Sequence, residues 1–133
     1  MYMVYRKRKV KRGSGPEHRI QNDIIAMLNL NRCSVYRINV GKVRTPDGRF
    51  FSTGAPNGMP DLFGFRWIDR RIFFIEVKSP KGRIRPDQLA FHQDLMHRHV
   101  IHGIARSVDD AMKIVKESLI GYGYPDTKEK AWL

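Results

Sequence analysis

The chain contains 133 residues, of which 41% are hydrophobic and 11% aromatic, enough for one packed domain and too many for a fully disordered chain. No apolar run approaches the roughly 18 residues of a membrane span, and the single cysteine excludes an internal disulfide framework and a cysteine-rich zinc site. The N-terminal residues lack the apolar stretch of a signal peptide, so we expect a soluble protein of the cytoplasm, or of the host cytoplasm if the chain is viral.

Lysine and arginine number 25 against 13 acidic residues, which gives a formal net charge of +12. Such an excess favours a polyanionic partner, either nucleic acid or an anionic membrane surface. Half of the excess falls on residues 1–15, a segment without acidic residues that ends in a glycine-rich hinge. We expect this arm to contact phosphates, with a solvated tail as the alternative. Its basic residues are Arg6, Lys7, Arg8, Lys9, Lys11 and Arg12.

The spacing of apolar and turn-forming residues predicts helices and strands in alternation. The helices are expected over 17–30, 86–100 and 108–119, and the strands over 35–40, 61–67, 71–78 and 102–106. Between the first two strands, Pro46-Asp47-Gly48 is typical of the tip of a hairpin. This order predicts an α/β fold with a mixed sheet flanked by helices. We expect a basic arm over 1–15, a domain over 16–120 and an irregular tail over 121–133.

Charged residues occur at the start of the strand over 61–67 and at the end of the strand over 71–78. The second of these strands is apolar on both faces, so we expect it at the centre of the sheet, where Glu76 is costly unless it is paired or bound to metal. A two-residue turn at Asp69-Arg70 would place Asp61 opposite Lys78 and diagonal to Glu76. Facing Cβ atoms lie about 5 Å apart and diagonal ones about 7 Å apart. The three side chains are therefore predicted to converge at one sheet edge, and a slip of one residue would turn Asp61 to the other face.

Two carboxylates without cysteine ligands or an obvious histidine trio favour Mg²⁺ or Mn²⁺ over zinc. Such an ion polarises a phosphoryl oxygen and lowers the pKa of a bound water. Lys78 would either stabilise the extra negative charge of the transition state or orient the attacking water. The pattern thus predicts metal-assisted phosphodiester hydrolysis. The alternative is a cross-strand salt bridge between Asp61 and Lys78 beside an unrelated Glu76.

Gly58-Met59-Pro60-Asp61, with Glu76-Val77-Lys78 following fifteen residues after Asp61, resembles the motif of the PD-(D/E)xK nucleases. Glu17 at the start of the first helix and Gln88 after the basic loop extend this likeness over about residues 15–119. The pattern resembles the VRR-NUC branch, in particular its small stand-alone members of phages and bacteria. This resemblance implies a restriction-endonuclease-like αβββαβ core, dependence on Mg²⁺ or Mn²⁺, and a homodimer that cleaves structured DNA such as four-way (Holliday) junctions. With DNA as partner, we expect no membrane association.

The resemblance also implies roles for individual residues. Asp61 and Glu76 would bind metal through their side chains, and the Val77 main-chain carbonyl would complete the inner ligand shell. Lys78 would be the catalytic lysine, Glu17 an outer acidic member and Gln88 a supporting polar residue. Two of these have other readings from the sequence alone, because Glu17 also fits a capping box with Ser14 and Gln88 also suits the first turn of its helix.

Further basic residues outside the arm are expected to contact nucleic acid: Lys42, Arg44 and Arg49 around the hairpin, and Lys81, Arg83 and Arg85 in the loop before the second helix. The four histidines at 92, 97, 99 and 102 fit no single helix face, so we expect solvated or partly buried residues rather than a metal cluster. The aromatic residues at 63, 65, 67, 73 and 74 are expected in the core. Two alternative functions remain open: a non-catalytic nucleic-acid-binding module, and a nuclease for RNA or for other DNA structures.

Overall fold

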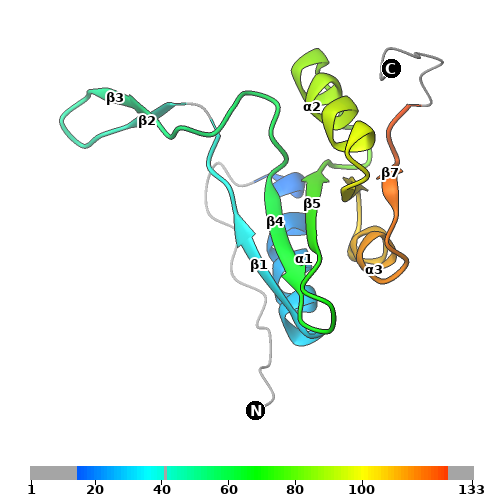
Figure 1. Cartoon of the computed structure of the whole chain (residues 1–133). Coiled ribbons are helices and arrows are strands. Elements are labelled where there is room, and N and C mark those ends of the chain that lie inside the picture. Colours follow the sequence, from blue (N-terminus) through cyan, green and yellow to red (C-terminus); the bar gives the residue numbers. More distant parts are fainter. Residues whose placement is uncertain (1–14, 41, 126–133) are drawn as a thin grey trace.

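The computed structural model of the chain describes residues 15–40 and 42–125 (Figure 1). Its three helices are α1 (Pro16–Leu30), α2 (Pro86–His97) and α3 (Val108–Lys116). The strands are β1 (Cys33–Arg37), β2 (Lys42–Arg44), β3 (Phe50–Ser52), β4 (Leu62–Arg66), β5 (Ile72–Val77), β6 (Ile101–Ala105) and β7 (Ile120–Tyr122). None of the described helices is long and apolar enough to cross a membrane. All six basic residues of the predicted arm lie outside the described residues, so the arm and the division of the chain at residues 15 and 120 stay predictions.

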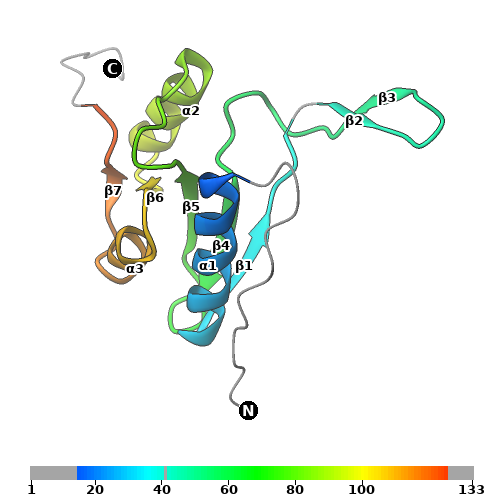
Figure 2. The ribbon, with the colours of Figure 1, turned by 180° about the vertical axis from the view of Figure 1, so that it is seen from behind.

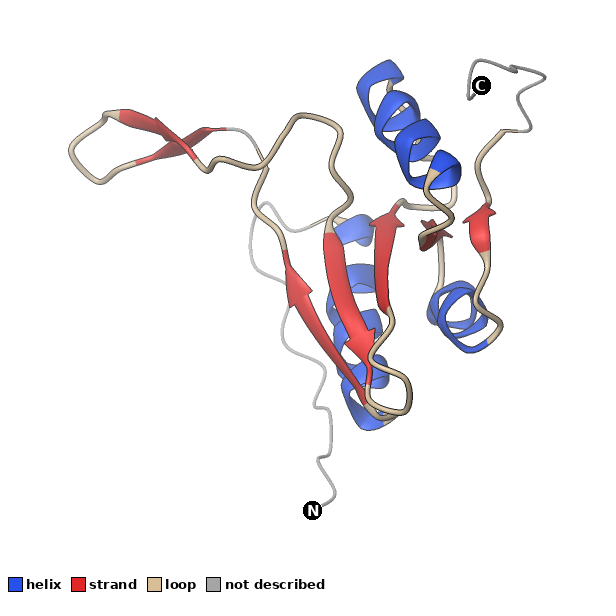
Figure 3. Cartoon of the chain, in the orientation of Figure 1, coloured by secondary structure: helices blue, strands red, loops and turns tan. Residues whose placement is uncertain are grey.

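Five strands form one mixed sheet in the order β1-β4-β5-β6-β7, and β2 pairs with β3 in a separate hairpin (Figure 3). The first three strands of the sheet are antiparallel, whereas β5, β6 and β7 run parallel to one another. The predicted α/β class and the central position of β5 are therefore confirmed. A strand with neighbours on both edges and cover on one whole face has little contact with water, which explains its nearly continuous apolar sequence.

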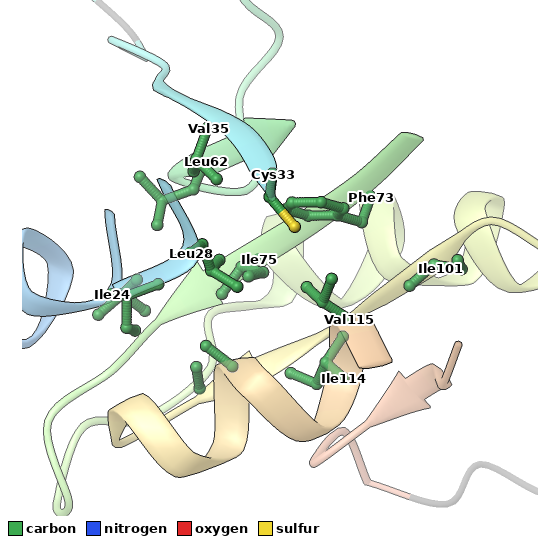
Figure 4. Packing of buried hydrophobic residues seen from close by; sticks show 13 residues of the cluster. Ile24, Leu28, Cys33, Val35, Leu62, Phe73, Ile75, Ile101, Ile114 and Val115 are labelled. Atoms are coloured by element: carbon green, nitrogen blue, oxygen red, sulfur yellow. The ribbon is translucent and has the colours of Figure 1, made fainter. Parts of the chain in front are cut away.

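The helices divide between the two faces of the sheet. α1 and α3 cover one face, where Ile24 and Leu28 of α1 pack with Phe73, Ile75 and other residues of the strands (Figure 4). Figure 2 shows α1 in front of β4 and β5 from this side. α2 lies on the opposite face, where its side chain His92 contacts His102 of β6. Because side chains alternate along a strand, residues 73, 75 and 77 belong to the covered face and residues 72, 74 and 76 to the face that carries α2.

Local signals account for the ends of the helices. Pro16 and Pro86 occupy first-turn positions, where a missing N–H is harmless, and the Ser107 side chain accepts a hydrogen bond from Asp110 N at the start of α3. The α3 stripe of Ala111, Ile114 and Val115 is buried.

Four details differ from the prediction. The first strand begins at Cys33 and ends at Arg37. α2 ends at His97 instead of continuing to 100, and α3 ends at Lys116 instead of continuing to 119. The expectation of irregular structure from residue 121 onward is wrong, because Ile120–Tyr122 forms β7 and extends the sheet beside β6.

Candidate active site

The register between β4 and β5 sets the position of the acidic residues. Leu62 pairs with Ile75 and Phe63 with Phe74, so the next pair along this ladder is Asp61 and Glu76. The predicted pairing of Asp61 with Lys78 is wrong by two residues, because the connection between the strands is longer than a two-residue turn: Arg66 N bonds to Arg71 O. A shift of two residues keeps every side chain on its face. Asp61 and Glu76 therefore still meet on the face that carries α2.

Asp61 is fixed by hydrogen bonds on both sides. Its Oδ2 accepts a bond of 2.8 Å from Val77 N, and its main-chain carbonyl accepts one of 2.7 Å from Ile38 N. The N–H and C=O of a strand residue point the same way, so the Val77 carbonyl also faces the Asp61 side. This direction is compatible with the ligand role that the family resemblance implies for that carbonyl.

Gly58 explains why the motif before Asp61 contains glycine. Its φ of +86° lies in the left-handed region, and a Cβ there would lie 2.1 Å from the main-chain oxygen of Asp87. Only glycine permits both this backbone conformation and this close approach. The turn that delivers Asp61 is thus seated against the first turn of α2.

One oxygen of the Glu76 carboxylate has two buried partners, Gln88 and Lys78. The side chain is 1% exposed, and its Oε1 accepts a hydrogen bond of 2.7 Å from Gln88 Nε2. The buried Lys78 ammonium lies 3.8 Å from the same oxygen. Gln88 also accepts a 3.0 Å bond from Arg85 N, so the amide serves the helix start and the acid at once. The ion pair of Lys78 joins it to Glu76 rather than to Asp61, which contradicts the alternative of a simple Asp61–Lys78 bridge.

Burial disfavours the ionised forms of both acids, and the charge of Asp61 adds to this effect at Glu76. Burial, and then the charge of Asp61, raise the pKa of Glu76 to about 8, although Lys78 opposes the shift. Burial also raises the pKa of Asp61, against the hydrogen bond from Val77 N. The half-buried Glu17 at the start of α1 contributes to raising the pKa of both, which brings the third predicted acid to the same region. The N-cap of α1 is Gly15, without a side-chain capping bond.

The two carboxylates fit a divalent cation. Glu76 Oε2 is buried and has no hydrogen-bond partner, which makes it the one such side-chain atom among the described residues. A cation beside it would satisfy this oxygen and offset the repulsion between the two acids. Within the described residues no group of three or more His, Cys, Asp or Glu side chains is arranged to hold a metal, so Asp61 and Glu76 would act with main-chain and water ligands.

Comparison with known families decides the relationship. A family model described as the VRR-NUC domain matches residues 15–109, which is more than half of the chain. The chain belongs to the VRR-NUC family. This is a nuclease family of the PD-(D/E)xK type, so the domain is a nuclease whose substrate is DNA. Comparison with curated proteins and with solved structures gave no match.

The VRR-NUC domain places the expected nucleic-acid contacts in two groups. Lys81, Arg83 and Arg85 are exposed on the loop between β5 and α2, and Arg44 and Arg49 are exposed on the β2–β3 hairpin. Lys42 begins β2. Arg106 went unrecognised in the sequence: its Nη1 donates to Ser79 O at 2.6 Å and to Gly82 O at 2.8 Å, and so holds the basic loop in place. No motif marks such a residue.

A second buried polar cluster lies beside the acids and was also missed. His92 Nδ1 and His102 Nε2 are 2.8 Å apart, and His102 Nδ1 donates to Val100 O at 2.7 Å. Tyr124 stacks on the His92 ring with centroids 3.8 Å apart. Burial, and then the charges of Glu76 and Asp61, raise the pKa of Tyr124, so its hydroxyl stays protonated near the acids. The inward position of His92 in the α2 pattern was the available signal, whereas Tyr124 follows the matched region.

The expectation that all five aromatic residues lie in the core is confirmed only for Phe73, which is fully buried. Phe63 and Phe74 are half-buried outside the core cluster. Phe65 is 37% and Trp67 53% exposed. α2 covers the β6–β7 side of its face and leaves β1, β4 and the start of β5 open.

Proposed function

We propose that this VRR-NUC domain is a metal-dependent endonuclease selective for branched DNA, including four-way junctions. The observation that carries the metal dependence is Glu76, a buried acid with a free oxygen beside Asp61 and Lys78. A structural salt bridge would leave neither an orphaned oxygen nor a pKa raised to about 8. These costs are accounted for if a cation occupies the site during the reaction.

The residues of the site divide the work. Asp61, Glu76 and the Val77 carbonyl would hold Mg²⁺ or Mn²⁺, which supplies Lewis-acid polarisation of a phosphoryl oxygen when bound. Lys78 holds a buried positive charge next to the position where negative charge accumulates on the phosphate. Gln88 fixes the orientation of Glu76, and Glu17 adds negative charge that favours the cation.

Selectivity for branched DNA is supported by the two separate basic groups on the loop over 81–85 and on the β2–β3 hairpin. Two contact regions on either side of a cleavage site bind duplex arms that diverge more readily than a single stripe would. The chain's net charge of +12 supplies the salt-dependent part of this affinity.

We also propose a homodimer, and the open sheet face supports a second copy as its partner. Tyr36 is 52%, Phe65 37% and Ile72 48% exposed on this face, and the Tyr36 ring lies 5.5 Å from that of Phe63. Patches of this kind on monomers mark interaction sites, and two copies related by a twofold axis would cover each other. Ile72→Asp should give a monomer in light scattering, while Ile68→Asp, at an 88% exposed loop position, should leave the dimer intact. A wild-type monomer refutes this part.

The function is tested by incubating purified protein with a four-way junction and with a continuous duplex of the same sequence, in Mg²⁺, Mn²⁺ or chelator. We expect cutting of the junction in either metal and none in chelator. Lys78→Met should abolish cutting and retain junction binding, whereas Lys116→Met, at an exposed position of α3, should cut normally. Equal cutting of both DNAs refutes the selectivity, and cutting in chelator refutes the metal dependence.

A further inference from the structure

The β2–β3 hairpin projects from the body of the molecule (Figures 1 and 2). It carries two exposed aromatic residues. β2 pairs only with β3 and is no part of the five-stranded sheet. Phe50 is 65% and Phe51 51% exposed. Exposed phenylalanines on a projecting ribbon add nothing to the core, so their presence requires another explanation.

The two rings lie on opposite faces of the ribbon. Phe50 pairs with Arg44 and Phe51 with Val43 across the hairpin, and successive residues of a strand point to opposite sides. The Arg44 guanidinium lies 5.9 Å from the centre of the Phe50 ring. An isolated ribbon of two short strands is only marginally stable in water. Within residues 15–40 and 42–125, nothing buries the ring on either face of this ribbon.

The tip of the hairpin is ordered by its own polar contacts. Thr45 N bonds to Arg49 O at 2.7 Å, and the Asp47 carboxylate accepts from Thr45 Oγ1 and, at 2.9 Å, from Arg49 Nε. An open hollow of about 500 Å³ lies beside these residues, and Phe50 and Phe51 also line it. The tip thus presents apolar rings beside guanidinium groups, a combination that suits nucleobases attached to phosphates.

The root of the hairpin stands at the acidic site. The chain leaves the sheet after Arg37 and returns at Asp61, and Ile38 N bonds to Asp61 O at 2.7 Å. The eight residue-to-residue steps from Ile38 to Pro46 span at most about 26 Å when extended. At about 3.4 Å per base step, the tip can reach roughly eight nucleotides from the site.

We propose that the β2–β3 hairpin is a nucleic-acid-binding arm whose Phe50 and Phe51 rings stack on unpaired bases of the DNA held at the acidic site. This inference rests on the proposed function, whose selectivity for branched DNA it explains: bases at a branch point are unstacked more easily than those of a continuous duplex. Local charge favours DNA as the occupant, because the guanidinium groups of Arg44 and Arg49 lie beside the exposed rings.

The experiment measures binding in chelator, so that cleavage plays no part. A four-way junction and a duplex of the same sequence carry 2-aminopurine at positions up to about eight nucleotides from the branch. Wild type should change the fluorescence of a base near the branch of the junction. Phe50→Leu with Phe51→Leu keeps apolar bulk but lacks the rings, and should remove this change. It should also weaken junction binding roughly 5- to 150-fold for each stacked base lost, while duplex binding changes less than about threefold.

Tryptophan at both positions should restore the signal, and Trp67→Leu, an exposed aromatic on the β4–β5 connection, should behave as wild type. Unchanged junction binding by the leucine pair, or an equal loss on both DNAs, overturns the proposal. So does a change of oligomeric state with DNA binding retained, which would mean that the arm grips a second copy. If the wild type cuts no DNA in Mg²⁺ but the leucine pair still loses the fluorescence change, the proposed nuclease function is refuted and the proposal of a DNA-binding hairpin is supported.

Discussion

Replacing Glu76 by glutamine should stabilise the metal-free protein while it abolishes cutting. Glu76 is 1% exposed and its pKa rises from an ordinary 4.5 to about 8 on folding. At pH 7 the unfolded chain carries this group ionised, so folding requires proton uptake or a buried charge. The linkage between protonation and folding puts this cost at about 3 kcal/mol of unfolding free energy at pH 7. Glu76→Gln removes it, keeps an Oε1 acceptor for Gln88, and should gain about 2–3 kcal/mol after loss of the Lys78 ion pair.

The pH dependence gives the prediction its sign. Because the folded protein binds this proton more tightly than the unfolded chain, the contribution is most favourable below pH 4.5 and is lost as the pH rises towards 8. Between these limits the unfolding free energy of the wild type should fall by up to about 1.4 kcal/mol per pH unit on account of Glu76. Glu76→Gln lacks this component, so the two proteins should differ most near pH 8.

Urea denaturation in chelator at pH 5, 6, 7 and 8 measures the gain in unfolding free energy of Glu76→Gln and the pH dependence of the wild type. The matched control is Glu117→Gln, at an exposed position after α3. Mg²⁺ should raise the midpoint of the wild type at pH 8 and leave that of Glu76→Gln unchanged. The reasoning is refuted if Glu76→Gln is less stable than wild type at pH 7 in chelator, or if both proteins follow the same pH profile.

Three further changes are expected to act through single contacts. Gly58→Ala should lower the unfolding free energy, measured in urea, by about 2–4 kcal/mol, because the new Cβ would lie 2.1 Å from a main-chain oxygen. Gly54→Ala is the control: it has the same φ of +86° but open space around it, and should lower the unfolding free energy by about 1 kcal/mol. Burial, and then His102, lower the pKa of His92 to about 4 from 6.5, so its contribution to stability should be intact above pH 6.5 and fall by about 2 kcal/mol at pH 5; His92→Asn should lack this component of the acid profile. Lys78→Met should reduce single-turnover cutting at least about 100-fold with junction binding within threefold, and a proportional loss of binding would contradict its role at the phosphate.

The sequence was sufficient to predict on which face of the sheet Asp61 and Glu76 lie. It was not sufficient to predict the register between β4 and β5. Alternation along β4 and β5 assigns Asp61 and Glu76 to one face of the sheet. This assignment survives any error in the predicted turn length that shifts the register by an even number of residues. The connection is longer than predicted because Arg66 bonds to the Asp69 carboxylate and, at 2.7 Å, to Val115 O of α3. This is a tertiary contact, and turn propensities of the residues at 69 and 70 do not contain it.

The C-terminal strand and the histidine cluster were missed for a related reason. Glycines at 121 and 123 indicate irregular structure, yet Gly121 lies in β7. The strand can approach Met96 because residue 121 has no side chain: a Cβ on Gly121 would lie 2.5 Å from Met96 Sδ. The burial of His92 and His102 depends on where α2 rests on the sheet. The exposure of Phe65 also depends on the position of α2, because this helix of twelve residues lies over β6 and β7 and leaves the other strands open. Hydrophobic patterns identify a buried face but not the length of sheet that a helix covers.

The docking of α2 is the step on which the site depends. Its first turn receives Gly58, whose turn delivers Asp61, and its Gln88 holds Glu76 at 2.7 Å. One turn further along, His92 anchors the helix to His102 of β6, the strand that pairs with β5. Two carboxylates that repel each other would separate if the elements carrying them were free to move. The covered face of β5, where Ile75 and Val77 are fully buried, holds one acid rigid, and α2 closes the other side against it. The cost of bringing the acids together is thus offset by packing away from the site, which leaves the repulsion available to favour a cation.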